Sequence, residues 1–589
     1  MQKFRVIDQT AVIEKTTKLF GLKLAPGAEL RAPEGKLLTM TYNGVQVNPI
    51  PGTYEGDVVL TITEPIHVGT MAQSDLKAAV CIGTDGVIPE KSVQAALLDG
   101  KIEGCEINNL KVCSQGDCFS AVYIDSDRDY VLNDPVIECI GNGENESVGE
   151  GAGIITAGTG KVTINRASIS VRGAARSALF GGGHSRLEIN DSDICTSGGV
   201  LPYDYQDSIA AGRMKRVPWM LGLRGNSRAT NLAECSEAVY NRCTITAAEW
   251  GAMSSDGVER CRLTLKDCTI RVTGPSGYGT FALLDTVNTL DHCKVDVPDY
   301  AFIVANGPAS TVITGGSDIH AGRFGAMCFR NTSGKVIVNG GSRIVSGETT
   351  FVVKGCSTSF EVEAATLEPG NGTILQVMDT DDPRNPQKYF VDSEELDVKN
   401  PNRDLTSADG EAVRADFSNM TINGSFFNGT TNRRYDTGPD MGDPHGPGGP
   451  GGPGMPPPPK PDERPAEQAK NMQITLRHVM LTGAISASTV RHAVKIISKE
   501  NCEDLGRVSN TPVPAVNNGV IAVLMDHTVW KPVGTNYLTK LVMDETSQIT
   551  DANMTVDGVP TELNPGNIYI GEIAITAISA KYSGINSGL

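Results

Sequence analysis

Apolar residues recur at a nearly constant spacing through the middle of this chain, and that spacing limits the folds available to it. The steps are about 25 residues long except for one of about 51 residues, so one unit carries about 26 additional residues. A fixed period between 20 and 50 residues is typical of stacked structural repeats. We therefore expect a stacked array with one enlarged unit, aligned on Ile169, Ile194, Ile245, Ile270, Val295, Ile319, Ile344 and Leu367.

Within each unit, apolar and polar residues alternate over four to six positions, which predicts short strands. Segments such as KVTINRASISV (161–171) and RLTLKDCTIRV (262–272) contain two such strands joined by a tight turn, and a third strand follows a Gly-rich corner. Three short strands in a coil of this length predict an all-β fold, a right-handed parallel β-helix. In it, equivalent residues of neighbouring coils stack about 4.8 Å apart.

The repeat and the composition divide the chain into four parts. We expect an N-terminal cap unit at 1–70 and a main β-helix at 71–430 with an inserted loop at 202–218. A Pro/Gly-rich excursion, 431–470, cannot build strands because it is too rich in these residues. It would be a spacer or, through its proline run, a ligand for an SH3-like partner. C-terminal coils and a second cap follow at 471–589.

Charge and sequence pattern restrict partners and location. The net charge of -18 disfavours nucleic acids and anionic membranes as partners. The first residues lack the apolar core of a signal peptide and no run of 18 apolar residues occurs, which predicts a cytoplasmic protein without membrane insertion. Removal of a signal would instead make it secreted or a cell-surface protein.

The 14 cysteines include no CxxC pair, so we expect free thiols and no metal. Cys243, Cys268 and Cys293 are 25 residues apart and occupy a coil position that other coils fill with Ala, Ser or Gly. That pattern predicts an inward slot for small side chains. A three-cysteine metal site is the alternative, but stacked cysteines generally behave as small hydrophobic residues.

The third strands carry two sets of side chains that packing alone does not require. Aligned on the repeat, they predict one ladder of aromatic residues, Trp250, Tyr278, Tyr300 and Phe324. They predict a second, polar ladder of Asp256, Asp285, Asn306, Arg330, Lys354 and Asp379. A solvated corner with an aromatic stack would explain both ladders equally well.

The enlarged unit favours a functional interpretation of this wall, because inserted loops of solenoids cluster on one face, often the binding face. We expect the insertion to roof a groove floored by the two ladders. It contributes Tyr203, Asp204, Tyr205, Asp207, Arg213, Lys215, Arg216, Trp219, Arg224 and Arg228.

Several motifs resemble a family of right-handed β-helix proteins of anaerobic Gram-positive bacteria, most of them called hypothetical or adhesin-like. The resemblance covers nearly the whole chain. It is carried by GEGAGI from Gly149, ARSA from Ala175, VPWMLG from Val217, RATNL from Arg228, EWGAMSSDG from Glu249, GYGTFA from Gly277, RFGAM from Arg323, TTFVVKG from Thr349, LQVMDTDDP from Leu375 and VPAVNNGVIAVL from Val513. It implies the fold and leaves the activity open.

Our leading hypothesis is an enzyme that performs acid–base chemistry in this groove on a polar, carbohydrate-like or carboxylated small molecule or oligosaccharide. A lyase or isomerase would use Arg or Lys to stabilise an anionic intermediate, whereas a glycoside hydrolase would use two carboxylates. The catalytic candidates are Asp204, Arg224, Glu249, Asp256, Tyr278, Arg323 and Lys354. The substrate-binding candidates are Tyr203, Trp219, Arg228, Trp250, Tyr300, Asn306, Arg330 and Asp379.

Alternatives remain for the protein and for individual residues. The chain could be a non-enzymatic adhesin-like or structural β-helix, or a sugar-binding module in which Trp219, Trp250 and Tyr278 stack on rings. His184 and His320 are further candidate bases, although exposure in a turn is the simpler interpretation. No cofactor is expected; the acidic turn at Asp379–Pro383 would be the site of a Ca²⁺ ion, but a solvated loop explains it more simply.

Overall fold

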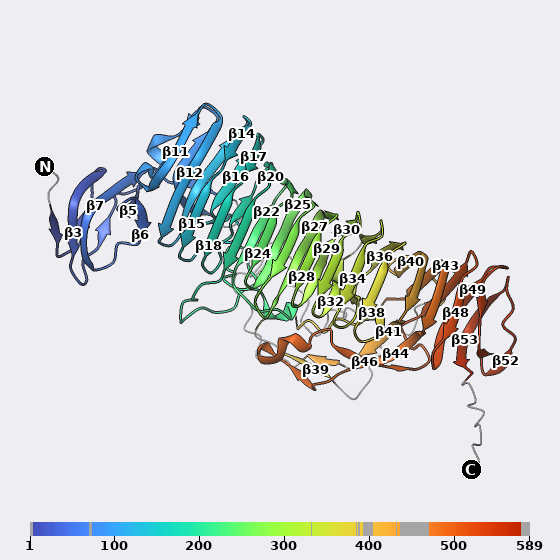
Figure 1. Cartoon of the computed structure of the whole chain (residues 1–589). Helices are drawn as coiled ribbons and strands as arrows, with labels where there is room; N and C mark the ends of the chain where they lie inside the picture. Colours follow the sequence, from blue (N-terminus) through green and yellow to red (C-terminus); the bar gives the residue numbers. More distant parts are fainter. Residues whose placement is uncertain are drawn as a thin grey trace, which may run out of the picture.

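The computed structural model describes residues 4–69, 73–331, 333–383, 386, 389–392, 404–431, 433–435 and 470–578. Its architecture is all-β, with 48 mostly parallel strands in one continuous sheet, an arrangement consistent with a β-solenoid. Figure 1 shows the strands stacked side by side along one long axis, from the N-terminal to the C-terminal end. In the part of the chain described, no helix is both long and apolar enough to cross a membrane.

The strands fall into three parallel stacks, because most strands of the array pair with the strand three places later in the chain. The first stack contains β14 (Tyr130–Asn133), β17 (Lys161–Asn165), β20 (Arg186–Asn190), β23 (Glu237–Asn241), the second half of β25 (Trp250–Lys266) and of β27 (Gly277–Asp291), β30 (Ser310–Thr314), β33 (Gly334–Val338), β36 (Thr358–Glu363), β40 (Val413–Asn423), β43 (Met472–Gly483) and β47 (Val520–Met525). The second contains β15 (Val136–Ile140), β18 (Ser168–Arg172), β21 (Asp193–Ser197), β24 (Thr244–Ala247), β26 (Thr269–Val272), β28 (Lys294–Val297), β31 (Asp318–Ala321), β34 (Arg343–Ser346) and β37 (Thr366–Pro369).

The third stack, which we call the third sheet, positions the candidate site. It contains β13 (Phe119–Ser126), β16 (Ile154–Gly158), β19 (Leu179–Gly181), β22 (Arg228–Ala233), the first halves of β25 and β27, β29 (Tyr300–Gly307), β32 (Phe324–Asn331), β35 (Phe351–Lys354), β38 (Thr373–Met378), β41 (Ser425–Thr431) and β44 (Ile485–His492).

The recurring apolar positions pair with one another in the second stack, and this confirms the alignment of the repeats. Ile194 pairs with Ile245 across the long step, just as Ile169 pairs with Ile194 across a regular one. The remaining pairs continue without a break to Leu367. All eight side chains are buried, so the period records the spacing of inward-facing residues in successive coils.

The cysteine slot is a packing feature, as predicted. Cys243, Cys268 and Cys293 are each buried, and the Cys243 amide donates to the Cys268 sulfur at 3.4 Å. Ser317 fills the same place in the next coil, where its hydroxyl accepts from the Cys293 amide. The residue before this slot is left-handed in each of these coils, for example Arg242 at φ 54°, so the turn repeats with the array.

Both ends of the array are antiparallel. At the N-terminal end, β5 (Leu37–Tyr42) pairs with β6 (Val45–Val47) and with β7 (Gly52–Thr63), and β3 (Thr17–Leu24) also pairs with β7. The C-terminal end repeats this pattern with β51 (Ala552–Val556), β52 (Val559–Thr561) and β53 (Ile568–Ala577), the last of which pairs with β49 (Thr535–Met543). The Pro/Gly-rich segment 431–470 lies almost entirely outside the described residues.

Two excursions leave the coils and lie on the outer face of the third sheet. One is residues 198–227, with the short 3₁₀ helix η3 (Trp219–Leu221); the other is residues 493–507, with β45 (Ile496–Ile497) and η5 (Lys499–Asp504), which precedes β46 (Val508–Pro512). We call these two segments, with the strand β39 (Phe390–Asp392) that pairs with β45, the cover. Figure 1 shows β39 and β46 lying beside the middle of the array.

Candidate functional site

The aromatic ladder exists, but Trp250 is not a member of it. Tyr278, Tyr300 and Phe324 pair in register across β27, β29 and β32, and the Tyr300 and Phe324 rings stack at 5.4 Å. Trp250 pairs instead with Gly277, one position before the ladder, and has a left-handed φ of 64°. The period of the repeats does not reveal this one-residue offset, because it predicts that each third strand begins at the same position of the coil.

The predicted polar ladder is wrong for four of its six members. The ladder that the structure contains is Asp256, Leu283, Ala305, Phe329, Lys354 and Met378. Asp285, Asn306, Arg330 and Asp379 occupy later positions on their strands or in the loops that follow. Asn306 and Arg330 are left-handed, at φ 49° and 51°, so the strand direction changes there and their side chains leave the ladder.

The cover packs directly on the aromatic residues. Val217 and Leu223 of the first excursion belong to one apolar cluster with Trp250, Tyr278, Tyr300 and Phe324, whose side chains are at most 4% exposed. Trp219 packs in a neighbouring cluster with Phe390, Ile497, Cys502 and Leu505. The insertion therefore lies over the third sheet as expected, but it fills the expected groove at these residues. Their ring faces are not available to stack on a sugar.

Arg323 holds the two excursions together and is not placed for catalysis. Its guanidinium donates to the carbonyls of Gly222 and Leu505, at 2.9 and 2.8 Å, and pairs with Asp299 at 3.3 Å. It also lies 5.0 Å from each of the Tyr300 and Phe324 ring centroids. The Tyr300 hydroxyl donates to the Leu221 carbonyl at 2.9 Å. Both predicted site residues thus fasten the cover to the sheet.

Lys354 likewise belongs to a buried ionic group that we call the clasp, formed by Lys354, Asp381, Asp392 and His492. Asp381 pairs with Lys354 at 2.7 Å and with His492 at 3.1 Å, and it accepts from the Gly506 amide at 2.6 Å. His492 also lies 3.6 Å from Asp392. The Lys354, Asp381 and His492 side chains are at most 3% exposed, and their charges face one another.

The clasp shifts the pKa values of its members in opposite directions. Burial by itself raises the pKa of Asp381, but Lys354 and His492 outweigh it and hold that pKa well below its usual range. Burial lowers the pKa of His492, but hydrogen bonds to Asp381 and Asp392 outweigh it and raise that pKa. The ionised forms of both groups are therefore stabilised together.

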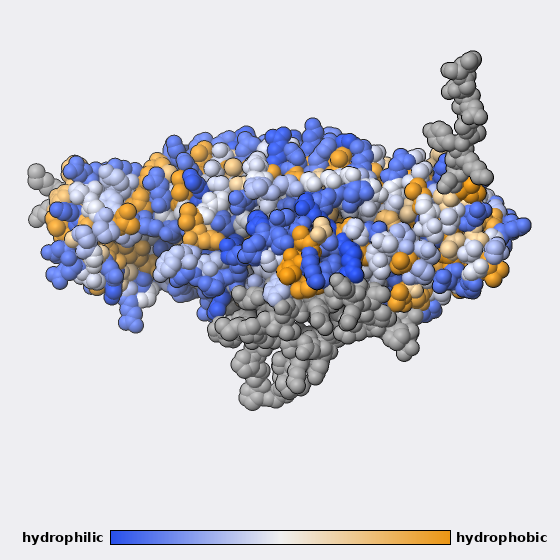
Figure 2. All heavy atoms as spheres, turned by 90° about the horizontal axis from the view of Figure 1, so that it is seen from below, coloured by the Kyte–Doolittle hydropathy of each residue, from blue (hydrophilic) through white to orange (hydrophobic). Residues whose placement is uncertain are grey.

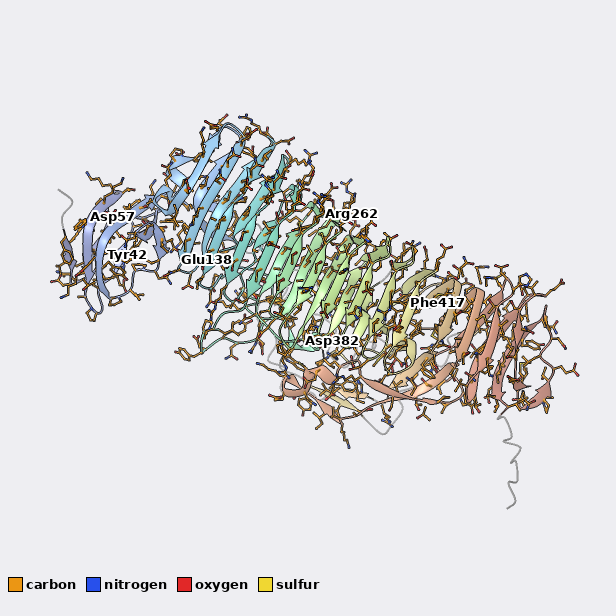
Figure 3. The ribbon with its side chains drawn as sticks, viewed as in Figure 1. Tyr42, Asp57, Glu138, Arg262, Asp382 and Phe417 are labelled. Carbon is orange, nitrogen blue, oxygen red and sulfur yellow. The ribbon has the colours of Figure 1, made fainter. Side chains whose placement is uncertain are left out.

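The acidic turn Asp379–Pro383 is buried, which corrects the expectation of a solvated loop. Asp379, Asp381 and Asp382 are 5%, 0% and 8% exposed. Asp379 accepts from the Thr431 amide at 2.9 Å, and Asp382 pairs with Arg330 at 3.3 Å. Figure 3 shows Asp382 on the side of the coils next to the cover, away from Arg262. Across the described ranges, no three or more His, Cys, Asp or Glu side chains are grouped so as to hold a metal.

A second polar group occupies the N-terminal end of the covered face. We call Glu146, Arg228, Asn231, Ser254, Asp256 and Tyr278 the polar cluster. Arg228 pairs with Asp256 at 2.7 Å and lies 4.8 Å from the centroid of the Trp250 ring. The Tyr278 hydroxyl is 2.5 Å from the Ser254 hydroxyl, and Asn231 pairs with Ser254 in the sheet. Arg228, Asp256 and Tyr278 are thus the predicted site residues that the structure brings together.

Glu146, which the sequence did not suggest, completes this cluster from the loop that follows β15. One carboxylate oxygen, Oε1, accepts from the Gly212 amide of the cover at 2.9 Å. The other, Oε2, is buried and makes no hydrogen bond with any described residue. Burial raises the pKa of Glu146 to about 7, against the opposing effects of Arg228 and the Gly212 amide. The GEGAGI motif from Gly149 lies in this loop but does not include Glu146, which meets the other residues only through the folded cover.

The polar cluster is less enclosed than the clasp. The Asp256 side chain is 25% exposed, and Phe281 and Leu283, which pair with Ser254 and Asp256, are half-buried. Tyr278 is fully buried, which raises its pKa to about 12 and keeps its hydroxyl protonated. The cluster therefore combines proton donors, a carboxylate and an apolar surface beside a partly open edge.

The remaining predicted residues lie outside the cluster. Tyr203 and Asp204 are exposed on the outside of the insertion, and Arg224 pairs with Glu503 at 2.8 Å on the surface of the cover. Glu249 is half-buried in the corner beside Gly225. Among the described residues, no hydrogen bond joins His184 or His320 to the polar cluster. These positions do not support the proton-transfer roles expected for Asp204 and Glu249.

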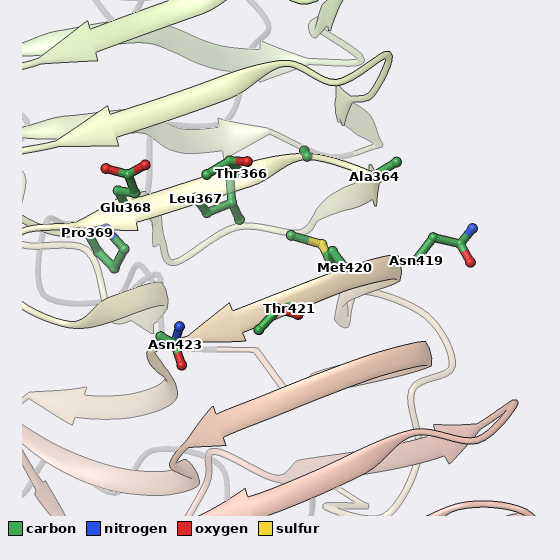
Figure 4. Close-up of a pocket in the computed structure, with 10 residues that line it drawn as sticks. Ala364, Thr366, Leu367, Glu368, Pro369, Asn419, Met420, Thr421 and Asn423 are labelled. Carbon is green, nitrogen blue, oxygen red and sulfur yellow. The ribbon is translucent and has the colours of Figure 1, made fainter.

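Two cavities lined by described residues lie away from the polar cluster. One, of about 640 Å³, opens between β37 and β40 and is lined by Thr366, Leu367, Glu368 and Thr421 among others (Figure 4). The other, of about 360 Å³, lies beside Asp404 and Lys470. Figure 2 shows small, separate apolar patches among hydrophilic residues on the face seen from below, which does not suggest a broad apolar docking surface there.

No protein-family model matches this chain, and no curated protein matches it either. The geometry of the polar cluster is therefore the basis for any functional inference.

Proposed function

We propose that this protein is an enzyme that performs acid–base chemistry on a polar, carbohydrate-like or carboxylated substrate at the polar cluster. We further propose that its solenoid is a right-handed parallel β-helix related to the family that the motifs resemble. The observation that carries the function is a pair of carboxylates in unlike surroundings on one face: Glu146 is buried with one free oxygen, and Asp256 is partly exposed and paired with Arg228.

One carboxyl group of such a pair can donate a proton while the other accepts one. Near neutral pH, the raised pKa of Glu146 leaves a substantial fraction of this carboxyl protonated, and Oε1 is already occupied by the Gly212 amide, so the proton belongs on Oε2. Asp256 is partly exposed and pairs with Arg228 at 2.7 Å. Two carboxyl groups in such unlike surroundings suit the roles of general acid and general base.

In the proposed reaction, Glu146 donates a proton from Oε2 to the leaving or developing anionic oxygen. Asp256 accepts a proton at the open edge, or stabilises positive charge there. Arg228 holds Asp256 in place through their ion pair. The separation of the acting carboxylates would distinguish retaining from inverting glycosidases if the substrate is a glycoside.

The test is a screen of the full-length protein against oligosaccharide panels. Release of reducing ends would detect hydrolysis, and new absorbance near 235 nm, expected for an unsaturated uronate, would detect a lyase. Glu146→Gln should then lower kcat by about 10²- to 10⁴-fold, the contribution typical of a general acid. Glu144→Gln is a matched control, because Glu144 lies in the same loop, is exposed and pairs with Lys215.

An inactive screen, or equal activity in Glu146→Gln and wild type, would contradict the proposal. In that case the second candidate is a non-enzymatic, structural or adhesin-like solenoid. The specific observation in its favour is the clasp, in which the predicted catalytic residue Lys354 is buried and paired with Asp381, and Asp381 is paired with His492. A sugar-binding module built on Trp219, Trp250 and Tyr278 has no such support, since all three side chains are at most 5% exposed.

A further inference from the structure

We infer that the polar cluster binds an uncharged, polyhydroxylated group, such as a neutral pyranose, and not the carboxylate of an anionic substrate. This inference rests on the proposed function and narrows its substrate class. It depends on three features of the site: the pairing of the cations, the free buried oxygens, and the half-buried apolar residues at the open edge.

The cations beneath the cover are already neutralised. Arg228, Arg323 and Lys354 each pair with a buried or partly buried carboxylate, at 2.7, 3.3 and 2.7 Å. On the insertion itself, Lys215 pairs with Glu144, and Arg216 pairs with Asp207. An anionic substrate would have to displace one of these carboxylates from its cation, and an unpaired charge in such surroundings is unfavourable.

The free buried atoms of the cluster require a hydrogen-bonding partner that an anionic group cannot be. Asn231 is 1% exposed and its Oδ1 makes no hydrogen bond with a described residue, and the same is true of Glu146 Oε2. An amide oxygen requires a donor, whereas a protonated carboxyl can itself donate. Hydroxyl groups suit both atoms, because a hydroxyl can donate to Asn231 and can accept from Glu146. A carboxylate has no proton to give to Asn231.

The open edge provides an apolar surface next to these polar atoms. Phe281 and Leu283 are half-buried and lie on the strand adjacent to Ser254 and Asp256. The Phe281 ring lies 5.6 Å from that of Tyr278, in the same apolar cluster. The C–H face of a sugar ring packs well against such a surface while its hydroxyls turn toward polar atoms. Apolar contact with directed hydrogen bonds is the usual composition of small-molecule sites.

The experiment measures binding, independently of turnover, by isothermal titration calorimetry on the full chain. The probes are neutral tetrasaccharides of glucose and mannose and, separately, trigalacturonate. We expect a neutral probe to bind and Asn231→Leu to weaken that binding about tenfold, the effect of one lost hydrogen bond to a buried group. Asn288→Leu should leave binding unchanged; Asn288 is also buried with both amide atoms free, but it lies on the first stack, away from the cluster.

This inference would be overturned if trigalacturonate bound more tightly than every neutral probe, and if that binding disappeared in Asn231→Leu and weakened with salt. The acid–base proposal would then still stand. No binding of either class would also overturn it, and together with an inactive substrate screen would reject the proposed function. Asn231→Asp provides a second variant if Asn231→Leu unfolds. It keeps an acceptor oxygen, so it should retain neutral binding better than Asn231→Leu while binding trigalacturonate still more weakly than wild type.

Discussion

The two ends of the covered face use the same residue types in opposite ways. Asp256 and Lys354 lie on one ladder of the third sheet, separated by Leu283, Ala305 and Phe329. At the Lys354 end, the clasp is buried and each charge faces an opposite one. Asp381 Oδ1 and His492 Nδ1 make no hydrogen bond with a described residue, but they lie 2.7 Å from Lys354 and 3.6 Å from Asp392. At the Asp256 end, Glu146 and Asn231 keep free buried oxygens, and Asp256 is partly exposed.

This difference shows what separates a structural ionic group from a candidate site on a solenoid. A buried ionic group whose charges pair with one another offers no interaction to a ligand. Removing one of its members lowers the free energy of unfolding. A buried group with unsatisfied atoms near solvent is incomplete without a partner. The sequence placed Lys354 and Asp256 in one list of catalytic candidates, and only their partners distinguish them.

The largest expected effect is at the clasp. Lys354→Met removes the cation and leaves Asp381 buried without its ion pair to Lys354. We expect a loss of about 3–5 kcal/mol in the free energy of unfolding, as for other broken buried ion pairs. Urea denaturation at pH 7 measures it. A loss below about 1 kcal/mol would show that the clasp does not fasten the cover.

A smaller, pH-dependent effect is expected at Glu146. Its pKa is raised from 4.5 to about 7 in the folded protein, so the native state binds more protons than the unfolded state between these values. The wild type therefore loses stability as pH rises through this window, by about 2 kcal/mol between pH 5.5 and pH 8. Glu146→Gln keeps the acceptor for Gly212 but cannot ionise, so it should lack this loss.

Denaturation curves at the two pH values, for wild type and Glu146→Gln, test this prediction. The variant should be close to wild type at pH 5.5 and more stable than it at pH 8. Identical pH profiles would mean that Glu146 has an ordinary pKa, and the difference between the two ends of the face would then be smaller than proposed.

The clasp should respond to pH in its own way. Because the pKa of His492 is raised, its stabilising contribution is complete below the ordinary value of 6.5 and is lost as pH rises through the raised value. The lowered pKa of Asp381 makes its contribution complete above 3.8 and lost only in strong acid. Hydrogen exchange in residues 493–507, corrected for the intrinsic rate, should therefore accelerate at alkaline pH. His492→Gln should remove that dependence, and unchanged exchange in the wild type would contradict it.

The smallest effect is expected on the exposed surface of the loop that carries Glu146. Glu144→Gln removes a largely exposed partner of Lys215, so the free energy of unfolding should change by less than about 1 kcal/mol. Thermal unfolding of the variant alongside Glu146→Gln would compare two carboxylates of one loop. A large loss in Glu144→Gln would show that the ion pair, and not the burial of Glu146, anchors the insertion.

Much of the array could be predicted from the sequence, because its signals are local and periodic. The pairing of Ile194 with Ile245 across the long step follows from the spacing alone, as does the burial of Cys243, Cys268 and Cys293. Placement on the third sheet was less predictable, since Trp250 and Arg330 adopt left-handed conformations that shift the register or end the ladder. Such local changes leave no clear mark in hydrophobic periodicity.

The sequence by itself determined the period, the all-β architecture and the face on which the insertion lies, because each depends on residues close together in the chain or repeated at a fixed interval. Only the tertiary structure decided which polar residues are partners. Glu146 meets Gly212, and Asp381 meets Lys354 and His492, through contacts between segments far apart in sequence. Whether a charge is satisfied or left free depends on those contacts, and so does the difference between the clasp and the polar cluster.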